Sequence, residues 1–190
     1  MNTHMLRLAL FAATLLAAAA LPAQAAEWTM DAGASRLEFA VTFEKSVAPG
    51  VFREFDTRVR FDADKTAESR IDVGIATSSA DMNIAAANKA ISGPEWFDFA
   101  RFPRSEFHAT DIRRTDAGRY LARGVLSLKG VQQPVEVPFT WTESDGTARM
   151  DGELVVQRSA FGIGTGEWAA TKVIGADVKI RFRVRLRKLG

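Results

Sequence analysis

The segment 178–187 alternates apolar and basic residues without interruption, with the sequence VKIRFRVRLR. Successive side chains of a β-strand point to opposite faces of a sheet, so strict alternation predicts one buried face and one solvated face. The buried face would carry only large apolar side chains, which a single strand cannot remove from water by itself. The segment therefore predicts a closed, β-rich domain that receives this face.

Further segments alternate in the same way and are separated by turn sequences rich in Asp, Gly and Ser, as at 116–118 and 144–146. Together with the last segment they make about eight strands, and strands at this spacing are typical of an antiparallel meander, sandwich or barrel. The other segments are 37–43, 55–61, 71–75, the residues around Phe107, 120–128, 135–141 and 150–156.

The interval between the third and fourth of these segments is predicted to be helical. Asp81 is expected to cap an alanine-rich run from Met82 to Ile91, which Gly93 and Pro94 would end. A second short turn follows at 95–99, with the sequence EWFDF. Its three aromatic side chains are expected to cover an apolar opening.

Residues 1–25 have the features of a secretory signal peptide. A weakly basic start precedes an apolar run over 8–21, and the sequence PAQA at 22–25 supplies an A-x-A cleavage pattern. We therefore expect cleavage near Ala25, export, and one mature domain over 26–190 with a single core. The alternative is a transmembrane anchor, which the short run disfavours because a span needs ~20 apolar residues.

Charge and composition exclude several classes of function. The chain has 25 Lys and Arg against 23 Asp and Glu, so it carries no basic field that would suit a nucleic acid partner. Cysteine is absent, which excludes disulfides and thiolate metal sites. His108 is the sole histidine after residue 25, so any Ser-His-Asp arrangement would depend on it alone. We expect no enzyme, no catalytic residue and no metal site.

Two smaller features have ordinary structural explanations. Nothing in the spacing of the carboxylates Glu95, Asp98, Glu106 and Asp111 distinguishes an acid–base pair from solvated surface positions. The glycine-rich sequence at 162–166 lacks the Lys-Ser/Thr that follows in a phosphate-binding loop, and a bent connection between strands is the preferred interpretation.

Several motifs carry a resemblance to a known family and occur in that family's order. The block GVLSLKGVQQPV at 124–135 resembles the G-x-L-x-[LI]-x-G-V-x-x-P-V element of the YceI-like family. Residues 50–55 resemble its G-x-F-x-x-F turn. Residues 96–107 resemble its F-F-D…Y-P…F segment, and residues 158–163 its R-x-x-F-G-I element. The resemblance covers essentially the whole chain after residue 25.

The resemblance implies an all-β fold: an eight-stranded antiparallel lipocalin-like barrel, with one or two short helices capping the opening. It also implies a periplasmic protein that binds a polyisoprenoid or similar long lipid in its interior. A barrel of this size can hold one small ligand. Thirteen Phe against one Tyr indicate an interior without hydroxyl groups, which suits an alkyl or isoprenyl chain. No cofactor is expected beyond such a bound lipid, for example an isoprenoid or a quinone.

We expect the apolar face of each strand to line the cavity and the aromatic residues after the helix to form a lid. The alternative is that these side chains interdigitate and leave no cavity. The expected ligand-binding residues are Phe39, Val41, Phe43, Val59, Phe61, Val73, Ile75, Leu126, Leu128, Val137, Phe139, Phe182 and Val184 in the strands, and Trp96, Phe97 and Phe99 in the lid.

The chain departs from the family at Phe43, where many members place a histidine, and at 84–87, where the family often has charged residues or histidine. These positions could contact a polar head group, so the exact ligand is left open. Two functions remain. The first is a periplasmic carrier of a long-chain amphipathic lipid. The second is an envelope accessory or stress-response protein that is associated with a membrane redox system and does not transport lipid.

The basic side chains of 179–187 allow two interpretations. They could contact anionic head groups at a membrane surface, or they could form cross-strand ion pairs with acidic residues such as Glu38. The near-neutral net charge favours the ion pairs. Whether the protein forms a homodimer is open.

Overall fold

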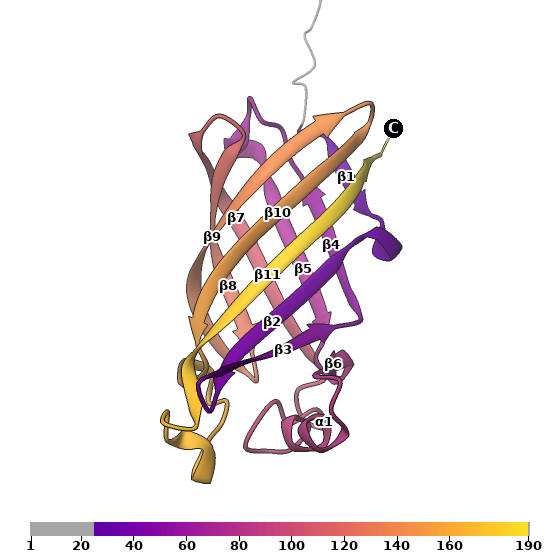
Figure 1. Ribbon diagram of the computed structural model, residues 1–190. Helices are drawn as coiled ribbons and strands as arrows, with labels where there is room; N and C mark the ends of the chain where they lie inside the picture. Colours follow the sequence, from indigo (N-terminus) through magenta and orange to yellow (C-terminus); the bar gives the residue numbers. More distant parts are fainter. Residues whose placement is uncertain (1–24, 190) are drawn as a thin grey trace, which may run out of the picture.

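Residues 25–189 fold into a closed antiparallel barrel with one short α-helix at one end (Figure 1). The computed structural model describes residues 25–189, so the expected signal peptide, apart from Ala25, lies outside the described residues. The strands are β1 (Glu27–Met30), β2 (Arg36–Phe43), β3 (Ser46–Phe52), β4 (Phe55–Arg60), β5 (Arg70–Ala76), β6 (Ala80–Asp81), β7 (Arg104–Asp116), β8 (Arg119–Leu128), β9 (Val131–Ser144), β10 (Thr147–Gln157) and β11 (Ile174–Lys188); the α-helix is α1 (Ala85–Ile91).

Closure depends on three interrupted strands. β1 and β2 both pair with β11, one after the other along its length, and so act as one strand of the barrel. On their other side β2 pairs with β3 and β1 pairs with β4, so β3 and β4 together form the next strand. β5 and β6 form a third interrupted strand, because they pair with β4 and β3 in succession. Counting each of the three interrupted pairs once, the barrel has eight strands, and every neighbouring pair is antiparallel. This confirms the predicted eight-stranded antiparallel barrel. Closure also removes the free sheet edges that would otherwise pair with other chains.

The alternation in β11 sorts its side chains as predicted. Ile180 and Phe182 pack against the hydrophobic core inside the barrel, whereas Arg183 lies outside and pairs with Glu38 of β2 at 3.2 Å. The predicted cross-strand pairing with Glu38 is confirmed. Other acidic side chains pair with the remaining basic residues of β11: Glu153 with Lys179 and Arg181, Asp151 with Arg185, Asp31 with Arg187, and Glu143 with Lys188.

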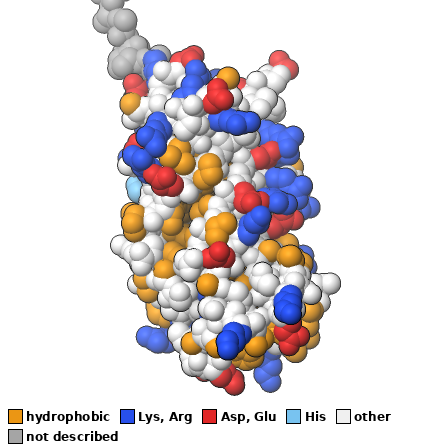
Figure 2. Space-filling view, turned by 60° about the vertical axis from the view of Figure 1, so that its left-hand side comes forward, with side chains coloured by type: hydrophobic (Ala, Val, Ile, Leu, Met, Phe, Trp, Pro, Cys, Tyr) orange, Lys and Arg blue, Asp and Glu red, His pale blue; other side chains and the backbone are white. Residues whose placement is uncertain are grey.

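Most of these ion pairs are exposed, although Arg185 and Asp151 are half-buried. Exposed pairs contribute only about 0–1 kcal/mol each to stability. Their main consequence is that the basic row is neutralised by neighbouring strands. Figure 2 shows the same mixture on one face, where Lys and Arg are interspersed with Asp and Glu over the upper and right-hand parts. Hydrophobic side chains are more frequent over the middle and lower parts of this face.

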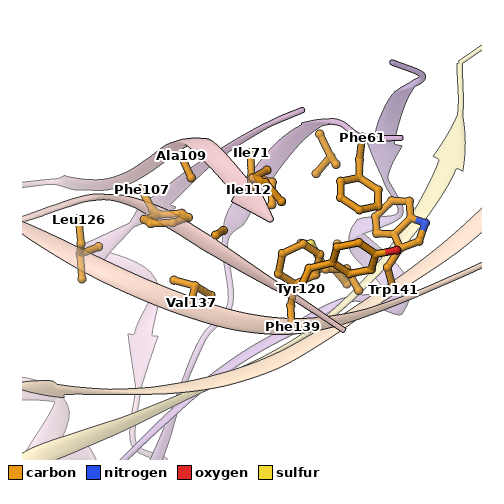
Figure 3. Packing of buried hydrophobic residues seen from close by; sticks show 14 of the residues in the cluster. Phe61, Ile71, Phe107, Ala109, Ile112, Tyr120, Leu126, Val137, Phe139 and Trp141 are labelled. Carbon is orange, nitrogen blue, oxygen red and sulfur yellow. The ribbon is translucent and has the colours of Figure 1, made fainter. Parts of the chain in front are cut away.

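One end of the barrel is filled by aromatic side chains, which we call the plug (Figure 3). Phe61 lies at its centre, with its ring centroid 4.5 Å from Trp141, 5.0 Å from Tyr120 and 5.8 Å from Phe139. Trp28 completes the plug by an edge contact with Trp141 and by donating a hydrogen bond from Nε1 to the carbonyl of Phe61 at 3.2 Å. The plug leaves the opposite end of the barrel to receive α1 and the long connection from β10 to β11.

The helix after β6 ends at Ile91, as predicted, but it starts three residues later than the expected Met82, and its capping differs. It begins at Ala85, Ile84 occupies the N-cap position, and no side chain caps it. Asp81 belongs to β6 and instead accepts hydrogen bonds from the backbone of Asn83 and from the side chain of Asn88. Within residues 25–189 no helix is long and apolar enough to cross a membrane.

The sequence interpretation missed β1, β3 and β6. Strand β3 contains Pro49 and Gly50, two residues that normally weaken a strand, and its last residues belong to the segment 50–55 that resembles a turn of the family. It is nevertheless paired with β2 along its whole length, from Ser46 opposite Phe43 to Phe52 opposite Leu37. This pairing extends the barrel wall toward the end that carries α1.

Candidate ligand-binding cavity

The interior contains two adjoining apolar cavities, which we call the lower chamber and the upper channel. The lower chamber has a volume of about 480 Å³ and lies between the barrel wall, α1 and the connection from β10 to β11. The upper channel has a volume of about 90 Å³ and leads toward the plug. The two share the lining residues Leu37, Ile75, Leu126 and Ile180, so they lie against each other.

The lining is almost entirely hydrophobic. Ser105 and Arg158 are the polar residues around the lower chamber, and Thr57 is the polar residue around the upper channel, within the described part of the chain. The hydroxyl of Thr57 donates a hydrogen bond to the carbonyl of Asp72 at 3.0 Å. The cavity therefore offers long apolar walls with very few polar groups.

Glycines in neighbouring strands let three phenylalanine rings lie flat against the wall. A Cβ atom built at Gly50 would be only 2.2 Å from Cζ of Phe39, so no larger residue fits under this ring. The same arrangement pairs Phe107 with Gly124 and Phe182 with Gly152. Because each ring occupies the space that a side chain on the neighbouring strand would fill, the centre of the barrel stays open.

The lower chamber reaches the surface at a mouth beside α1. Phe43 and Ile84 line the chamber and are nevertheless 42% and 61% exposed. Val47, at the tip of the hairpin from β2 to β3, is 73% exposed, and Val173 beside it is 45% exposed. The backbone of Glu44 in this tip donates a hydrogen bond to the carbonyl of Val173 at 2.9 Å. The rim of the mouth therefore carries exposed apolar side chains beside the exposed charged residues Glu44 and Lys45 of the hairpin tip.

Arg158 holds together the connection that forms one side of the mouth. Its side chain is almost completely buried, and burial lowers the pKa of its guanidinium group. Each N–H donor is used by a backbone carbonyl: Gly175 accepts from Nε, Ile163 and Gly164 from Nη1, and Trp168 and Ile174 from Nη2, at 2.7–3.1 Å. Arg158 is thus a structural centre for the loop and has no N–H left for a ligand.

Lys129 fixes the lid to the same connection. Its Nζ atom donates hydrogen bonds of 2.7 Å to the carbonyls of Pro94 and Gly162, and burial lowers its pKa. The backbone of Gly164 also donates to the carbonyl of Glu95 at 2.7 Å. The glycine-rich sequence at 162–166 joins β10 to β11, as predicted, and is followed by a short 3-10 helix over Gly166–Ala169.

Most residues expected to bind the ligand lie on the cavity, although their role in binding remains a prediction. Those on the lower chamber are Phe39, Val41, Phe43, Leu128, Trp96 and Phe97; those on the upper channel are Val73, Val137, Phe139, Phe182 and Val184; Ile75 and Leu126 border both.

Three of the expected residues lie elsewhere. Val59 and Phe61 are buried in the packed end of the barrel and do not line either cavity, because alternation specifies the inward face of a strand but not the depth along the barrel axis. Phe99 stacks on Phe97 with ring centroids 6.0 Å apart and stays off the chamber lining. It supports the lid instead of facing the cavity.

Several lining residues were missed. Leu37 and Phe107 share the inward alternation of their strands and could have been found from it. The positions of Ala86, Ala87 and Ala90 in α1, and of Phe161, Ile163 and Trp168 in the connection, could not be predicted, since they depend on how the loops fold over the mouth. His108 lies outside the cavity and pairs with Asp72 on the exposed surface.

The comparisons with known proteins agree with this architecture. The family model of the YceI-like domain matches residues 28–186. A UPF0312 protein of Shewanella denitrificans is 34% identical over 140 residues, which cover 72% of each chain. A UPF0312 protein of Azotobacter vinelandii is 35% identical over 88 residues, or 46% of each chain.

Two solved structures extend the comparison. BcnA of Burkholderia cenocepacia is 30% identical, with a TM-score of 0.80 over 82% of this chain and 98% of its own. A polyisoprenoid-binding domain from Saccharophagus degradans is 14% identical with a TM-score of 0.68 over 85% of this chain and 98% of its own, which shows a shared fold. With the family model matching from β1 to β11, the chain belongs to the YceI-like family.

Proposed function

We propose that the protein is a periplasmic carrier that holds a polyisoprenoid or a similar long-chain amphipathic lipid without transforming it. The observation that carries the proposal is the lower chamber, whose volume of about 480 Å³ lies within the usual range of ligand sites. An apolar space of this kind gives water few hydrogen-bond partners, so an apolar chain is the better occupant. The Saccharophagus neighbour, described as a polyisoprenoid-binding domain, supports this choice.

The energetics favour a long chain. Burial of each methylene contributes about 0.8 kcal/mol, so ten buried carbons contribute about 8 kcal/mol. Association costs about 4–15 kcal/mol, which a short chain cannot offset. We therefore expect affinity to rise with chain length until the lower chamber and the upper channel are filled.

The proposal places lipid exchange at the mouth. Its rim carries exposed apolar side chains, including Phe43 and Val47, which suit a transient contact with a membrane surface. The basic row of β11 is a poorer candidate, because acidic neighbours such as Glu38 and Glu153 already pair with it. The periplasmic location rests on the export signal expected in residues 1–25.

Blocking the lower chamber tests the proposal. Ala87 of α1 lines the chamber, whereas Ala85 of the same helix is exposed and does not line it. We expect Ala87→Trp to lower the affinity for an apolar fluorescent probe and for farnesol and geranylgeraniol, which are measured as competitors of the probe. Ala85→Trp should leave all three affinities unchanged. Failure of the wild-type protein to bind the probe or either alcohol would overturn the proposal, as would equal affinities in both variants.

A further inference from the structure

We propose that Ser105 hydrogen-bonds an uncharged oxygen of the bound lipid, so that the polar end of the lipid lies in the lower chamber and its chain extends into the upper channel. The inference rests on the proposed lipid-binding function. It adds the class of the polar group, an alcohol or a carbonyl, and the direction in which the ligand lies.

The starting observation is a buried hydroxyl without a partner. Ser105 lines the lower chamber from the start of β7 and is only 2% exposed, and within residues 25–189 no group hydrogen-bonds its Oγ atom. Buried hydroxyls elsewhere in the barrel are satisfied by backbone carbonyls: Thr57 donates to Asp72, and Thr77 donates to Phe102. Since buried polar groups in native proteins normally have partners, Ser105 requires one from the space that it faces.

A second unpartnered group borders the same chamber. The indole Nε1 of Trp96 is buried and has no acceptor among the described residues. A third such group, Nε1 of Trp141, belongs to the plug and lies away from both cavities. Two residues on the lining of the lower chamber, Ser105 and Trp96, therefore carry buried hydrogen-bonding atoms without partners, although its other walls are almost entirely apolar.

The distribution of polar groups sets the orientation of the ligand. In the upper channel the hydroxyl of Thr57 is already engaged by Asp72, so that cavity offers only apolar contact. An oxygen buried there would lose its hydration without compensation, which is costly. The ligand is therefore more stable with its oxygen in the lower chamber and its hydrocarbon chain pointing toward the plug.

The same inventory favours an uncharged oxygen. Arg158 is the cation on the lining, and backbone carbonyls already use its N–H groups. A carboxylate or phosphate in this chamber would find no charged donor to replace its hydration, and burial of such an anion is far more costly than burial of an alcohol. Neutral donors such as Ser105 and Trp96 are sufficient for a hydroxyl or carbonyl.

A matched pair of ligands tests the proposal. Phytol and phytane share a branched C20 carbon skeleton, and phytol adds a hydroxyl and one double bond; the comparison of each variant with the wild-type protein for the same ligand isolates the hydroxyl. The variants are Ser105→Ala and the control Ser127→Ala. Ser127 of β8 pairs with Glu106, the residue that follows Ser105 in β7, so its side chain lies on the opposite face of the sheet from Ser105. Affinity is measured by displacement of an apolar fluorescent probe, and thermal melting checks that each variant is folded.

We expect Ser105→Ala to weaken phytol binding about two- to tenfold, as for loss of one neutral hydrogen bond, and to leave phytane binding unchanged. The melting temperature of the ligand-free variant should be no lower than that of the wild-type protein, because the variant removes a buried hydroxyl without a partner. Ser127→Ala should change neither affinity. Trp96→Phe, which keeps an aromatic ring but removes the N–H, should also weaken phytol selectively.

The proposal is overturned if Ser105→Ala binds phytol as tightly as the wild-type protein does, or if it loses phytol and phytane equally. If the wild-type protein binds phytane but does not prefer phytol, the cavity binds lipid and the assignment of Ser105 is wrong. If the wild-type protein binds neither compound, the proposed function itself fails.

Discussion

Replacing Gly50 by alanine should push the Phe39 ring into the lower chamber. The new Cβ atom would lie 2.2 Å from Cζ of Phe39, and ordinary contact begins at 3.4 Å, so the ring must retreat by at least 1.2 Å. The three atoms nearest to the new Cβ atom all belong to the Phe39 ring, so the ring can move without a shift of the backbone. Overpacking of this kind costs about 1–3 kcal/mol, and the displaced ring should also lower the affinity for an apolar probe.

A double-mutant cycle isolates this contact. Phe39→Leu alone should cost about 1–2 kcal/mol, less than truncation to alanine. In the Gly50→Ala background the same change relieves the clash, so the free energies of unfolding should differ from additivity by about 1 kcal/mol or more. Urea unfolding of the four proteins measures this coupling, and probe binding should recover partly in the double variant.

Gly33 provides the control, because a Cβ atom there would lie 3.6 Å from its nearest neighbour, Oδ1 of Asp31. Gly33→Ala should change stability by no more than about 0.5 kcal/mol. Additive effects of Gly50→Ala and Phe39→Leu, or equal effects of Gly50→Ala and Gly33→Ala, would refute the view that glycines keep the aromatic rings against the wall.

Three further predictions concern other parts of the barrel. Arg158→Lys should lower the free energy of unfolding by about 3–5 kcal/mol, since buried carbonyls lose their partners; a cost below about 1 kcal/mol in urea unfolding would contradict this role. Phe182→Asp should abolish folding or probe binding, and Arg183→Ala should cost only about 0–1 kcal/mol because its ion pair is exposed; similar effects in circular dichroism and binding would mean that the assigned faces are wrong. Hydrogen bonds from Asn88 and from the backbone of Asn83, together with Arg53, lower the pKa of Asp81 from 3.8 to about 2. Because the pKa of Asp81 is lower in the folded state, its charged carboxylate stabilises the fold at pH values above the ordinary pKa of 3.8. This contribution should disappear as the pH falls from about 4 to about 2. Melting temperatures of the wild-type protein and Asp81→Asn should converge over this range, and a constant difference would count against it.

Alternation in the sequence was sufficient to predict an antiparallel meander, sandwich or barrel and the inward faces of its strands, and the resemblance to the YceI-like family selected the barrel. Alternation placed Phe182 inside and Arg183 outside, and it anticipated the pairing of β11 with Glu38. Such assignments depend on a two-residue period that the backbone imposes everywhere in a strand. Alternation does not specify height along the barrel, which is why Phe61 was expected on the cavity but lies in the plug.

Features that depend on the closed fold were not predictable from the sequence. The open lumen depends on Gly50 lying opposite Phe39 across two strands, and β3 itself was not recognised. The hydrogen bonds of Arg158 go to backbone carbonyls, so no side-chain motif reveals them. The unpartnered hydroxyl of Ser105 becomes visible only when every neighbouring group is in place.

The most direct test of the account is native mass spectrometry of the protein purified from the cells that produce it, followed by solvent extraction and identification of what it releases. We expect the folded protein to carry one lipid per chain, with a long hydrocarbon chain and an alcohol or carbonyl oxygen, and we expect Ala87→Trp to carry much less. The account would be contradicted if the purified wild-type protein carried no lipid and also bound no prenyl lipid that was added afterwards.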